Sequence, residues 1–329
     1  MNIKDFKDRI FQIASTIEFE ALCLELFRFQ ALHNTVYKRY IELLKIKASE
    51  ITHSSQIPFM PISFFKDFEI RSNKDPVTHT FTSSGTSGMS FSQHLVADIS
   101  IYEQGFIQGF EAFYGPIKNY CVLALLPSYL ERQGSSLIYM ADKLIQLSGH
   151  KQGGFYLNEF EELNTVLKKL EEQKQKTILL GVSFGLLDFS EAFHPKLEHT
   201  IVMETGGMKG RRKEMIRTEL HEALQQAFGL EQIHSEYGMT ELLSQAYCRH
   251  DQTFETPPWM KVYIRDTTDP LSLVPEGHTG GINIIDLANI ESCAFIATQD
   301  LGKKTKNDRF EVLGRFDNSD IRGCNLLIQ

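Results

Sequence analysis

Apolar positions near the N-terminus of the chain recur at helical spacing. In FEALCLELFRFQALHNTVYKRYIELLKI, the residues Phe19, Leu22, Leu26, Phe29 and Leu32 are three or four positions apart. Such spacing places side chains on one face of an α-helix. We therefore predict that roughly the first fifty residues are helical and that this apolar stripe packs against the rest of the protein.

From residue 77 onward, short apolar runs alternate with stretches of helical periodicity. The apolar runs predict strands at CVLALLP (121–127), KTILLGV (176–182) and HTIVMETGG (199–207), and VTHTF (77–81) is a further predicted strand. The periodic stretches predict amphipathic helices at FEELNTVLKKLEEQK (160–174) and RRKEMIRTELHEALQQAF (211–228). This alternation predicts an α/β fold with strands buried on both faces.

Beyond about residue 256 the pattern changes to turn-rich β structure, with PPWMKVYIRD, TGGINIIDL and ESCAFIATQDLG as predicted strands. Earlier, Pro58 and Pro61 end the helical region, because proline forces extended or turning backbone. We therefore divide the chain into a helical N-terminal lead-in, residues 1–72, and a core, residues 73–329.

Composition narrows the class of protein. The chain has 329 residues, 42% of them hydrophobic and 23% charged, which is typical of a folded globular protein. Its formal charge of −8 gives no basic surface for nucleic acid. No apolar run approaches the roughly 18 residues of a membrane span, and the N-terminus MNIKDFKDRIF mixes acids with bases. We expect a cytoplasmic protein with no membrane span.

The segment TFTSSGTSG combines hydroxyl side chains with glycines directly after a predicted strand. Hydroxyl donors and successive backbone N–H groups that face one way can wrap an anion. The segment is neither a Walker loop nor a dinucleotide fingerprint, because G-x-x-x-x-G-K-[ST] and G-x-G-x-x-G are both absent. On its own it is equally compatible with a plain flexible Ser/Gly loop.

Four further motifs follow in order: ETGGMKG (204–210), SEYGMTELLSQ (235–245), IATQDLG (296–302) and GRFDNSDIRG (314–323). Together with TSSGTSG they resemble the motifs of the adenylate-forming enzymes, the acyl- and aryl-CoA synthetases and their relatives. The resemblance implies that Thr240 faces the phosphates of ATP and that Glu241 holds Mg²⁺. It implies nucleotide-binding roles for Ser83, Ser84, Gly85, Thr86, Ser87, Gly88, Gly206, Gly207, Tyr237, Gly238, Asp300 and Arg315.

Over nearly its whole length the chain is similar to the acyl-protein synthetases of the LuxE type. Besides the motifs above, IPFMPISFFKDFEI, LLPSYLERQGSSLIYMAD, LLGVSFGLLDF and RGCNLL carry this resemblance. It implies ATP-dependent conversion of a carboxylic acid, here a medium or long fatty acid, to an acyl-adenylate. The acyl group then passes to a cysteine of the enzyme, and from there to an acyl-CoA reductase-type partner protein.

A thiolate suits the second step, because it is the softest nucleophile among ordinary side chains. The five cysteines are odd in number and scattered, which argues against a disulfide framework and a structural zinc site. Cys324 is the candidate acceptor, since it follows Gly323 in the tail of the chain. A role in packing the terminus remains the alternative.

The fold that this resemblance implies is a two-subdomain adenylate-forming core that lacks the mobile C-terminal domain. After Gly323 the sequence has no room for that domain or for the lysine that it contributes to adenylation. The phosphate loop also lacks the usual P-K-G. Arg315, Arg132 and Lys209 are candidate cations in place of the missing lysine.

Three other interpretations stay open. In the first, the enzyme transfers the acyl group to coenzyme A. In the second, the protein is a nucleotide-binding scaffold that has lost catalytic turnover. The third rests on GVSFG (181–185), which matches the G-x-S-x-G nucleophile elbow of α/β-hydrolases. Ser183 would be the nucleophile, with Asp266 or Asp286 as the acid and His278 as the base after Asp266. In the adenylate-forming resemblance, the same loop is a wall of the acyl pocket.

Overall fold

The computed structural model describes residues 1–83, 91–126, 134–206 and 215–316. Its helices are α1 (Ile3–Ile10), α2 (Thr16–His33), α3 (Thr35–Leu43), α4 (Phe64–Asp67), α5 (Ile99–Tyr114), α6 (Ser136–Ser148), α7 (Phe160–Glu172), α8 (Ser183–Phe193) and α9 (Arg217–Phe228), with 3-10 turns η1 (Ala48–Glu50), η2 (Ser54–Gln56) and η3 (Ile117–Asn119). Its strands are β1 (Met60–Pro61), β2 (His79–Thr82), β3 (Gln93–Val96), β4 (Cys121–Leu125), β5 (Gly154–Phe155), β6 (Thr177–Val182), β7 (Thr200–Thr205), β8 (His234–Tyr237), β9 (Ala246–His250), β10 (Thr253–Glu255), β11 (Met260–Arg265), β12 (Thr279–Asp286), β13 (Phe295–Lys304) and β14 (Phe310–Arg315).

A large mixed sheet runs through the described part of the chain, in the order β11-β12-β13-β14-β10-β9-β8-β7-β6-β4-β5. The strands from β5 to β8 are parallel, and those from β8 to β11 are antiparallel. β1 joins β13 in parallel, and β2 with β3 forms a separate hairpin. The switch from parallel to antiparallel pairing therefore falls at β8, which ends at Tyr237 of the Y-G-x-T-E motif.

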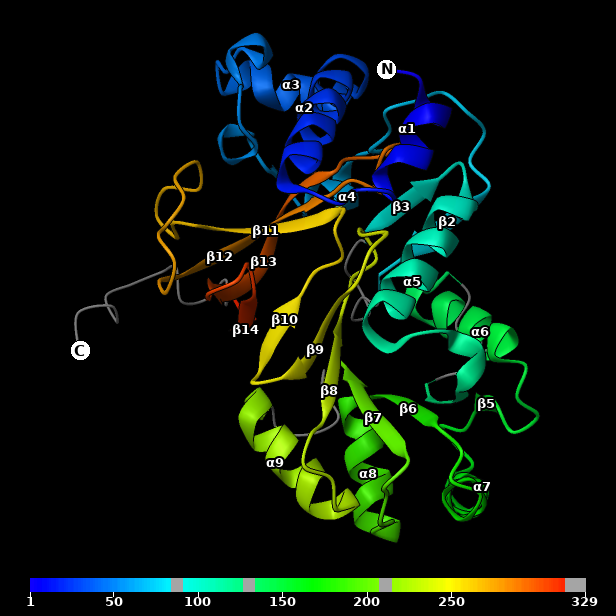
Figure 1. Cartoon of the computed structure of the whole chain (residues 1–329). Coiled ribbons are helices and arrows are strands. Elements are labelled where there is room, and N and C mark those ends of the chain that lie inside the picture. The colour runs from blue at the N-terminus through cyan, green and yellow to red at the C-terminus, as the bar shows by residue number, and fades with distance from the viewer. Residues whose placement is uncertain (84–90, 127–133, 207–214, 317–329) are drawn as a thin grey trace.

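Helices cover both faces of the parallel half. Along β4, Val122 and Ala124 belong to one hydrophobic cluster, while Leu123 and Leu125 belong to the other. This alternation is what a strand buried on both faces requires, because successive side chains point to opposite sides. The two clusters lie between the sheet and the helices, with α7, α8 and α9 together at one end of the molecule (Figure 1). The prediction of an α/β fold is confirmed.

The N-terminal helices pack against the antiparallel half and share its hydrophobic cluster (Figure 1). Phe27 of α2 meets Phe295 of β13 edge to face at 5.8 Å, and the Gln30 amide donates to the carbonyl of Asn289 at 2.8 Å. The N-terminal region also contributes a strand to the main sheet, because β1 pairs with β13. Residues of the lead-in and of the core contribute to one hydrophobic cluster. The division of the chain at residue 72 therefore stays a prediction.

The apolar stripe predicted on the first long helix is wrong at its C-terminal end. Leu32 is 62% exposed, whereas Cys23, Phe27 and Gln30 are buried. On a helix of about 3.6 residues per turn, Leu32 falls on the opposite side from Phe19. The true buried face follows the steps of four from Phe19, through Cys23 and Phe27, and from Leu22, through Leu26, and it therefore includes a polar residue, Gln30.

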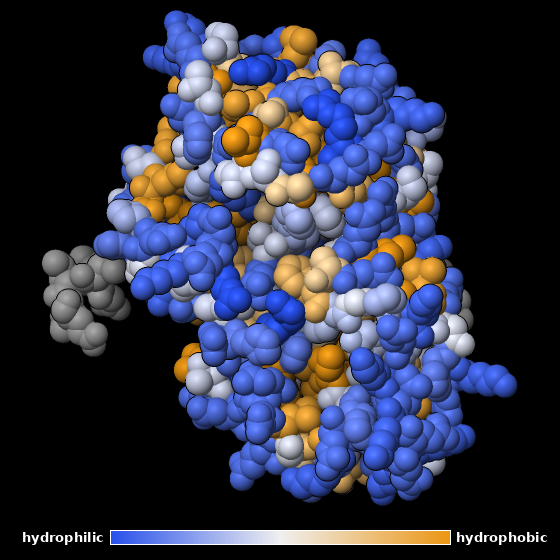
Figure 2. All heavy atoms as spheres, in the orientation of Figure 1, coloured by the Kyte–Doolittle hydropathy of each residue, from blue (hydrophilic) through white to orange (hydrophobic). Residues whose placement is uncertain are grey.

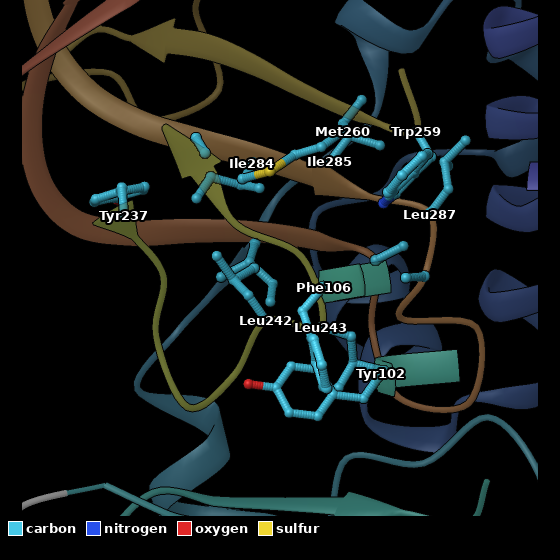
Figure 3. Packing of buried hydrophobic residues seen from close by; sticks show 14 of the residues in the cluster. Tyr102, Phe106, Tyr237, Leu242, Leu243, Trp259, Met260, Ile284, Ile285 and Leu287 are labelled. Atoms are coloured by element: carbon cyan, nitrogen blue, oxygen red, sulfur yellow. The ribbon is translucent and has the colours of Figure 1, made fainter. Parts of the chain in front are cut away.

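The segment that follows the Y-G-x-T-E motif is fixed by packing and by a buried carboxylate. Leu242 and Leu243 enter the hydrophobic cluster near Tyr102 of α5 (Figure 3). A side chain at Gly105 of α5 would approach the Leu243 carbonyl oxygen to 2.8 Å, so glycine allows this close approach. The carboxylate of Asp286 accepts the Leu243 N–H at 2.8 Å, which holds the segment from the sheet side.

The outer surface mixes both kinds of side chain. On the face in Figure 2, hydrophobic residues form scattered patches among hydrophilic ones. None of the helices that the structure describes is long and apolar enough to cross a membrane.

Candidate active site

Three of the predicted nucleotide-binding residues meet where β8, β13 and β14 come together. The hydroxyl of Tyr237 donates to Oδ2 of Asp300 at 2.8 Å, and Nε of Arg315 lies 3.2 Å from Oδ1 of the same carboxylate. Asp300 and Arg315 are direct partners in the β13–β14 register. Tyr237 and Asp300 are buried, while the Arg315 side chain is 60% exposed. The arrangement presents one carboxylate between a fixed phenol and an exposed guanidinium.

The Tyr237 ring is held by aromatic neighbours on its own sheet. Its centroid lies 5.7 Å from both Phe254 and Phe310. Burial, followed by the charge of Asp300, raises the pKa of the Tyr237 hydroxyl well above its ordinary value. The phenol therefore remains a proton donor toward Asp300 throughout the physiological range.

The two ends of the hydroxyl-rich segment meet at the base of the β2–β3 hairpin. The backbone N–H of Ser83 donates to the carbonyl of Ser92 at 3.1 Å, and the N–H of Ser92 donates to Oγ of Ser83 at 3.0 Å. The Ser92 hydroxyl in turn hydrogen-bonds toward the Glu241 carboxylate. Ser83 and Ser92 thus close the base of the hairpin, and Ser92 adjoins Glu241.

Glu241 is a buried carboxyl group with a polar environment. Burial raises its pKa, and the Ser92 hydrogen bond and the charges of Arg315 and Lys66 act against this rise. Its donor set fits magnesium, because Mg²⁺ is commonly held by one or two carboxylates together with substrate phosphates. Among the residues that the structure describes, no group of three or more His, Cys, Asp or Glu side chains could hold a metal by itself.

Thr240 is positioned through its backbone. Nδ1 of His94 lies 2.9 Å from the Thr240 carbonyl oxygen, and Nε2 lies 3.0 Å from the Ser292 hydroxyl. Burial lowers the pKa of His94 to about 4, so the ring is neutral at pH 7. Nδ1 then donates to Thr240, and Nε2 accepts from Ser292. His94 was not among the predicted site residues; a histidine beside a polar loop is too weak a signal.

A second buried glutamate lies next to the end of β7, which leads into the predicted nucleotide-binding glycine Gly206. Glu236 of β8 accepts from the Thr205 hydroxyl at 2.6 Å, and a side chain at Gly238 would meet its Oε1 at 2.5 Å. Burial raises the pKa of Glu236 to about 7, and the charge of Glu204 adds to the rise. Gly206, immediately after β7, is exposed. Glu236 was not among the predicted site residues, because its strand, HSEY, is polar throughout and an acid there carries no distinct signal.

The hydrolase interpretation finds no matching geometry. Ser183 is buried at the start of α8, and its hydroxyl lies 3.3 Å from Glu204, not from a histidine. Its backbone lacks the strain of a nucleophile elbow, since the described residues with positive φ lie elsewhere. Asp286 accepts from Leu243 and Ser244, and His278 is exposed. The described residues therefore do not assemble a Ser-His-acid triad around Ser183.

Several predicted residues lie outside the described part of the chain. They are Ser84, Gly85, Thr86, Ser87, Gly88, Gly207 and Cys324, together with the candidate cations Arg132 and Lys209. The structure gives no account of them.

Comparisons with known proteins agree with the fold. ATP-bound MatB from Rhodopseudomonas palustris is similar with a TM-score of 0.54 and 16% identity, over 74% of this chain and 49% of MatB. An open conformation of 2-hydroxyisobutyryl-CoA ligase in complex with 2-HIB-AMP and CoA is similar with a TM-score of 0.67 and 12% identity, over 93% of this chain and 72% of the ligase. The chain thus spans about half the length of MatB.

A comparison with curated proteins gives no match. The family model described as "Acyl-protein synthetase, LuxE" matches residues 159–329, just over half of the chain. The matched region contains Tyr237, Thr240, Glu241, Asp300 and Arg315, whose described contacts are given above. Its fold resembles that of adenylate-forming ligases, and the chain belongs to the LuxE acyl-protein synthetase family.

Proposed function

We propose that the protein activates a carboxylic acid with ATP, forming an acyl-adenylate and pyrophosphate, and then transfers the acyl group to its own Cys324. The observation that carries the proposal is the convergence of Tyr237 and Arg315 on the carboxylate of Asp300. We place Glu241 in the same proposed site, and the opposing effect of the Arg315 charge on its raised pKa supports this. Family membership and the likeness to ATP-bound MatB support this reading.

The proposed nucleotide contacts follow from the chemistry of these groups. Asp300 accepts hydrogen bonds from the ribose hydroxyls, because a carboxylate has about four lone-pair sites and its protein partners leave some of them free. The glycine turn at Gly206 and the Y-G segment, Tyr237 and Gly238, lie against the base. Ser83 and the segment after it, with Thr240, face the phosphates. Arg315 contributes positive charge beside the ribose.

Activation then needs orientation and charge neutralisation. The carboxylate oxygen of the acid attacks the α-phosphorus, the bond from that phosphorus to the leaving oxygen breaks, and pyrophosphate departs without a proton transfer. Mg²⁺ held by Glu241 would neutralise charge on the phosphates. Backbone N–H groups and hydroxyls add preorganised donors, which act most strongly where water is excluded.

The acceptor of the acyl group is proposed to be Cys324, because the described cysteines are unsuited to the role. Cys23, Cys121, Cys248 and Cys293 are all buried. Burial raises the pKa of Cys121 and Cys293 to about 12 and that of Cys248 to about 11, which disfavours the reactive thiolate. The Cys324 thiolate attacks the acyl carbon and AMP leaves. An acyl-CoA reductase-type partner would then receive a medium or long acyl chain.

Two measurements on the full chain test this proposal. Acid-dependent exchange of labelled pyrophosphate into ATP reports adenylation, and its absence with every acid tried would contradict the first step. Labelled fatty acid should then attach to the wild type and not to Cys324→Ser, whereas Cys121→Ser should label normally. Labelling that persists in Cys324→Ser contradicts the acceptor assignment, and free acyl-CoA formed without labelling identifies coenzyme A as the acceptor.

A further inference from the structure

Residues 287–294, which join β12 to β13, are buried along their whole length and are called the buried connection below. Connecting segments usually run over the surface, because a buried one needs partners for its backbone N–H and C=O groups. Its first residue, Leu287, belongs to the same hydrophobic cluster as Leu242 and Leu243 (Figure 3). The buried connection therefore packs beside the segment that follows the Y-G-x-T-E motif, and its polar groups need partners inside the protein.

Gln30 of α2 makes three hydrogen bonds to the buried connection. Its Nε2 donates to the carbonyl oxygens of Asn289 at 2.8 Å and Ile290 at 3.1 Å, and its Oε1 accepts the N–H of Ala294 at 2.9 Å. The Gln30 side chain is itself fully buried. An apolar side chain of the same size would fill this space but would leave three backbone groups without these hydrogen bonds. The amide of Gln30 therefore orients the connection as well as covering it.

Asn34, the residue that ends α2, adds a further hydrogen bond to the buried connection. Its Nδ2 donates to the carbonyl oxygen of Ser292 at 2.9 Å, and the Asn34 side chain is fully buried. The N-terminal helices thus bond to the buried connection at residues 289, 290, 292 and 294.

The buried connection in turn fixes the backbone of the Y-G-x-T-E segment. Nδ2 of Asn289 donates to the carbonyl oxygen of Glu241 at 2.8 Å. The Ser292 hydroxyl lies 3.0 Å from Nε2 of His94, and Nδ1 of the same ring lies 2.9 Å from the carbonyl oxygen of Thr240. The buried connection therefore reaches the backbone of Thr240 through a histidine and that of Glu241 directly.

Two consecutive hydrogen bonds lead from α2 to Glu241. Gln30 donates to the backbone carbonyl of Asn289, and the side chain of the same Asn289 donates to the backbone carbonyl of Glu241. All three residues are buried. A close-packed interior transmits a displacement, because it has little free volume to absorb one. Loss of either amide should therefore change the position of Glu241.

We propose that Gln30 and Asn289 are positioning residues for adenylation, and that α2 sets the place of Thr240 and Glu241 relative to the phosphates of ATP. This inference rests on the proposed function and extends it to the N-terminal helices, which lie outside the residues 159–329 that the family model matches. A misplacement of about 1 Å in a site can cost roughly 100-fold in rate. The two amides therefore matter for the reaction although neither touches a substrate.

Gln30→Met and Asn289→Leu test the inference in the full chain, because each keeps the size of the side chain and removes its hydrogen bonds. With ATP, magnesium and acid all saturating, the rate of pyrophosphate exchange should fall roughly 10- to 100-fold in each variant. The KM for ATP should change much less, because the partners of Asp300 lie outside the connection. The double variant should lose no more than the larger single loss, since the two amides act in series. Losses that multiply in the double variant contradict the proposed path.

A second measurement needs neither ATP nor metal. Amide hydrogen exchange in the ligand-free protein reports how firmly residues 237–245 are held, and it should be faster in Gln30→Met and Asn289→Leu than in the wild type. Tyr37→Phe is the matched control. Tyr37 is fully buried on α3, and its hydroxyl donates to the carbonyl of Pro58 at 2.7 Å, so this variant loses a buried hydrogen bond without changing one to the connection. It should keep both the rate and the protection of the wild type.

Wild-type rate and protection in both variants overturn the inference and leave the proposed function intact. Losses of equal size in Tyr37→Phe also overturn it, because they would trace the effect to general stability. If Gln30→Met does not fold, Asn289→Leu decides by the same measurements, since it loses only the bond to Glu241 and Oδ1 of Asn289 has no partner in the described structure. A wild type without pyrophosphate exchange for any acid contradicts the proposed function, and hydrogen exchange then still decides whether α2 fixes the segment.

Discussion

Tyr237 and Asp300 are joined by a buried hydrogen bond of 2.8 Å between the phenol and Oδ2. The bond links the end of β8, where the sheet changes from parallel to antiparallel, to the middle of β13. Arg315, the last residue of β14, approaches the other oxygen, Oδ1. The two contacts together fix the orientation of the carboxylate. A ligand that needs two acceptors in one plane therefore meets a carboxylate that is already oriented.

Removing the hydroxyl group in Tyr237→Phe should free the Asp300 side chain to rotate and weaken ATP binding roughly 10-fold. Hydrogen bonds to charged groups contribute about 1.5–3 kcal/mol, and a buried carboxylate oxygen that loses its donor is costly. The variant should also lose about 1–2 kcal/mol in the free energy of unfolding. Calorimetric ATP titration and urea denaturation measure the two effects.

Tyr40→Phe is the matched control for this prediction. The Tyr40 hydroxyl donates to the carbonyl of Phe59 at 3.0 Å, within the N-terminal helical region. Its removal should lower stability by a similar small amount and leave ATP affinity unchanged. Equal ATP affinity in Tyr237→Phe and the wild type would show that the hydrogen bond does not orient the nucleotide site.

The sequence predicts the parallel strands well because their apolar runs are short, continuous and bounded by turns. Cys121–Leu125, Thr177–Val182 and Thr200–Thr205 all lie inside the predicted runs. The face of α2 was less predictable, because apolar residues such as Leu32 also occur on its exposed side. Periodicity reports that a helix has an apolar face, while the neighbouring elements decide where that face is centred.

The order of the motifs along the sequence pointed to Tyr237, Asp300 and Arg315 as site residues. The structure brings these three residues together. Residues that act through packing were not predictable in this way. His94 lies far from Thr240 in sequence, and so does Ser292, the other partner of its ring. Only the fold places these three residues side by side, because β3 brings His94 against the segment that follows β8.

Glu241→Gln should weaken the dependence of exchange on magnesium. A neutral amide is a poorer ligand for a hard divalent cation than a carboxylate. We expect the magnesium concentration for half-maximal exchange to rise roughly 10-fold, measured at a fixed ATP concentration. Glu236→Gln changes another buried glutamate of the same segment and should leave this concentration unchanged. An unaltered magnesium requirement in Glu241→Gln would remove Glu241 from the metal site.

His94→Phe should reduce both stability and exchange. The phenyl ring can still pack on Phe65, but it leaves the Thr240 carbonyl and the Ser292 hydroxyl without their partner. A buried polar group without a partner costs about 1–3 kcal/mol, which urea denaturation measures. Because Thr240 then moves relative to Glu241, exchange should fall roughly 10-fold. Stability loss with full exchange would indicate that His94 supports the fold alone.

Glu236→Gln should change how stability depends on pH. Burial raises the pKa of Glu236 from its ordinary value of 4.5 to about 7, so the folded protein holds this proton more tightly than the unfolded chain. Its contribution to stability is therefore complete below about pH 4.5 and is lost as pH rises through about 7.

The glutamine variant keeps an acceptor for the Thr205 hydroxyl but has no proton to lose. Between pH 5 and pH 8 the wild type should thus lose about 1–3 kcal/mol of unfolding free energy relative to Glu236→Gln, as measured by urea denaturation at each pH. The exposed Glu222 of α9 provides the control, and Glu222→Gln should follow the wild-type profile. Parallel profiles for the wild type and Glu236→Gln would mean that the folded protein does not raise the pKa of Glu236 and that its carboxyl group is already ionised at pH 5. An acid stabilised as a carboxylate would give the wild type a gain in stability only as pH rises toward about 4.5, so a loss between pH 5 and pH 8 is specific to a raised pKa.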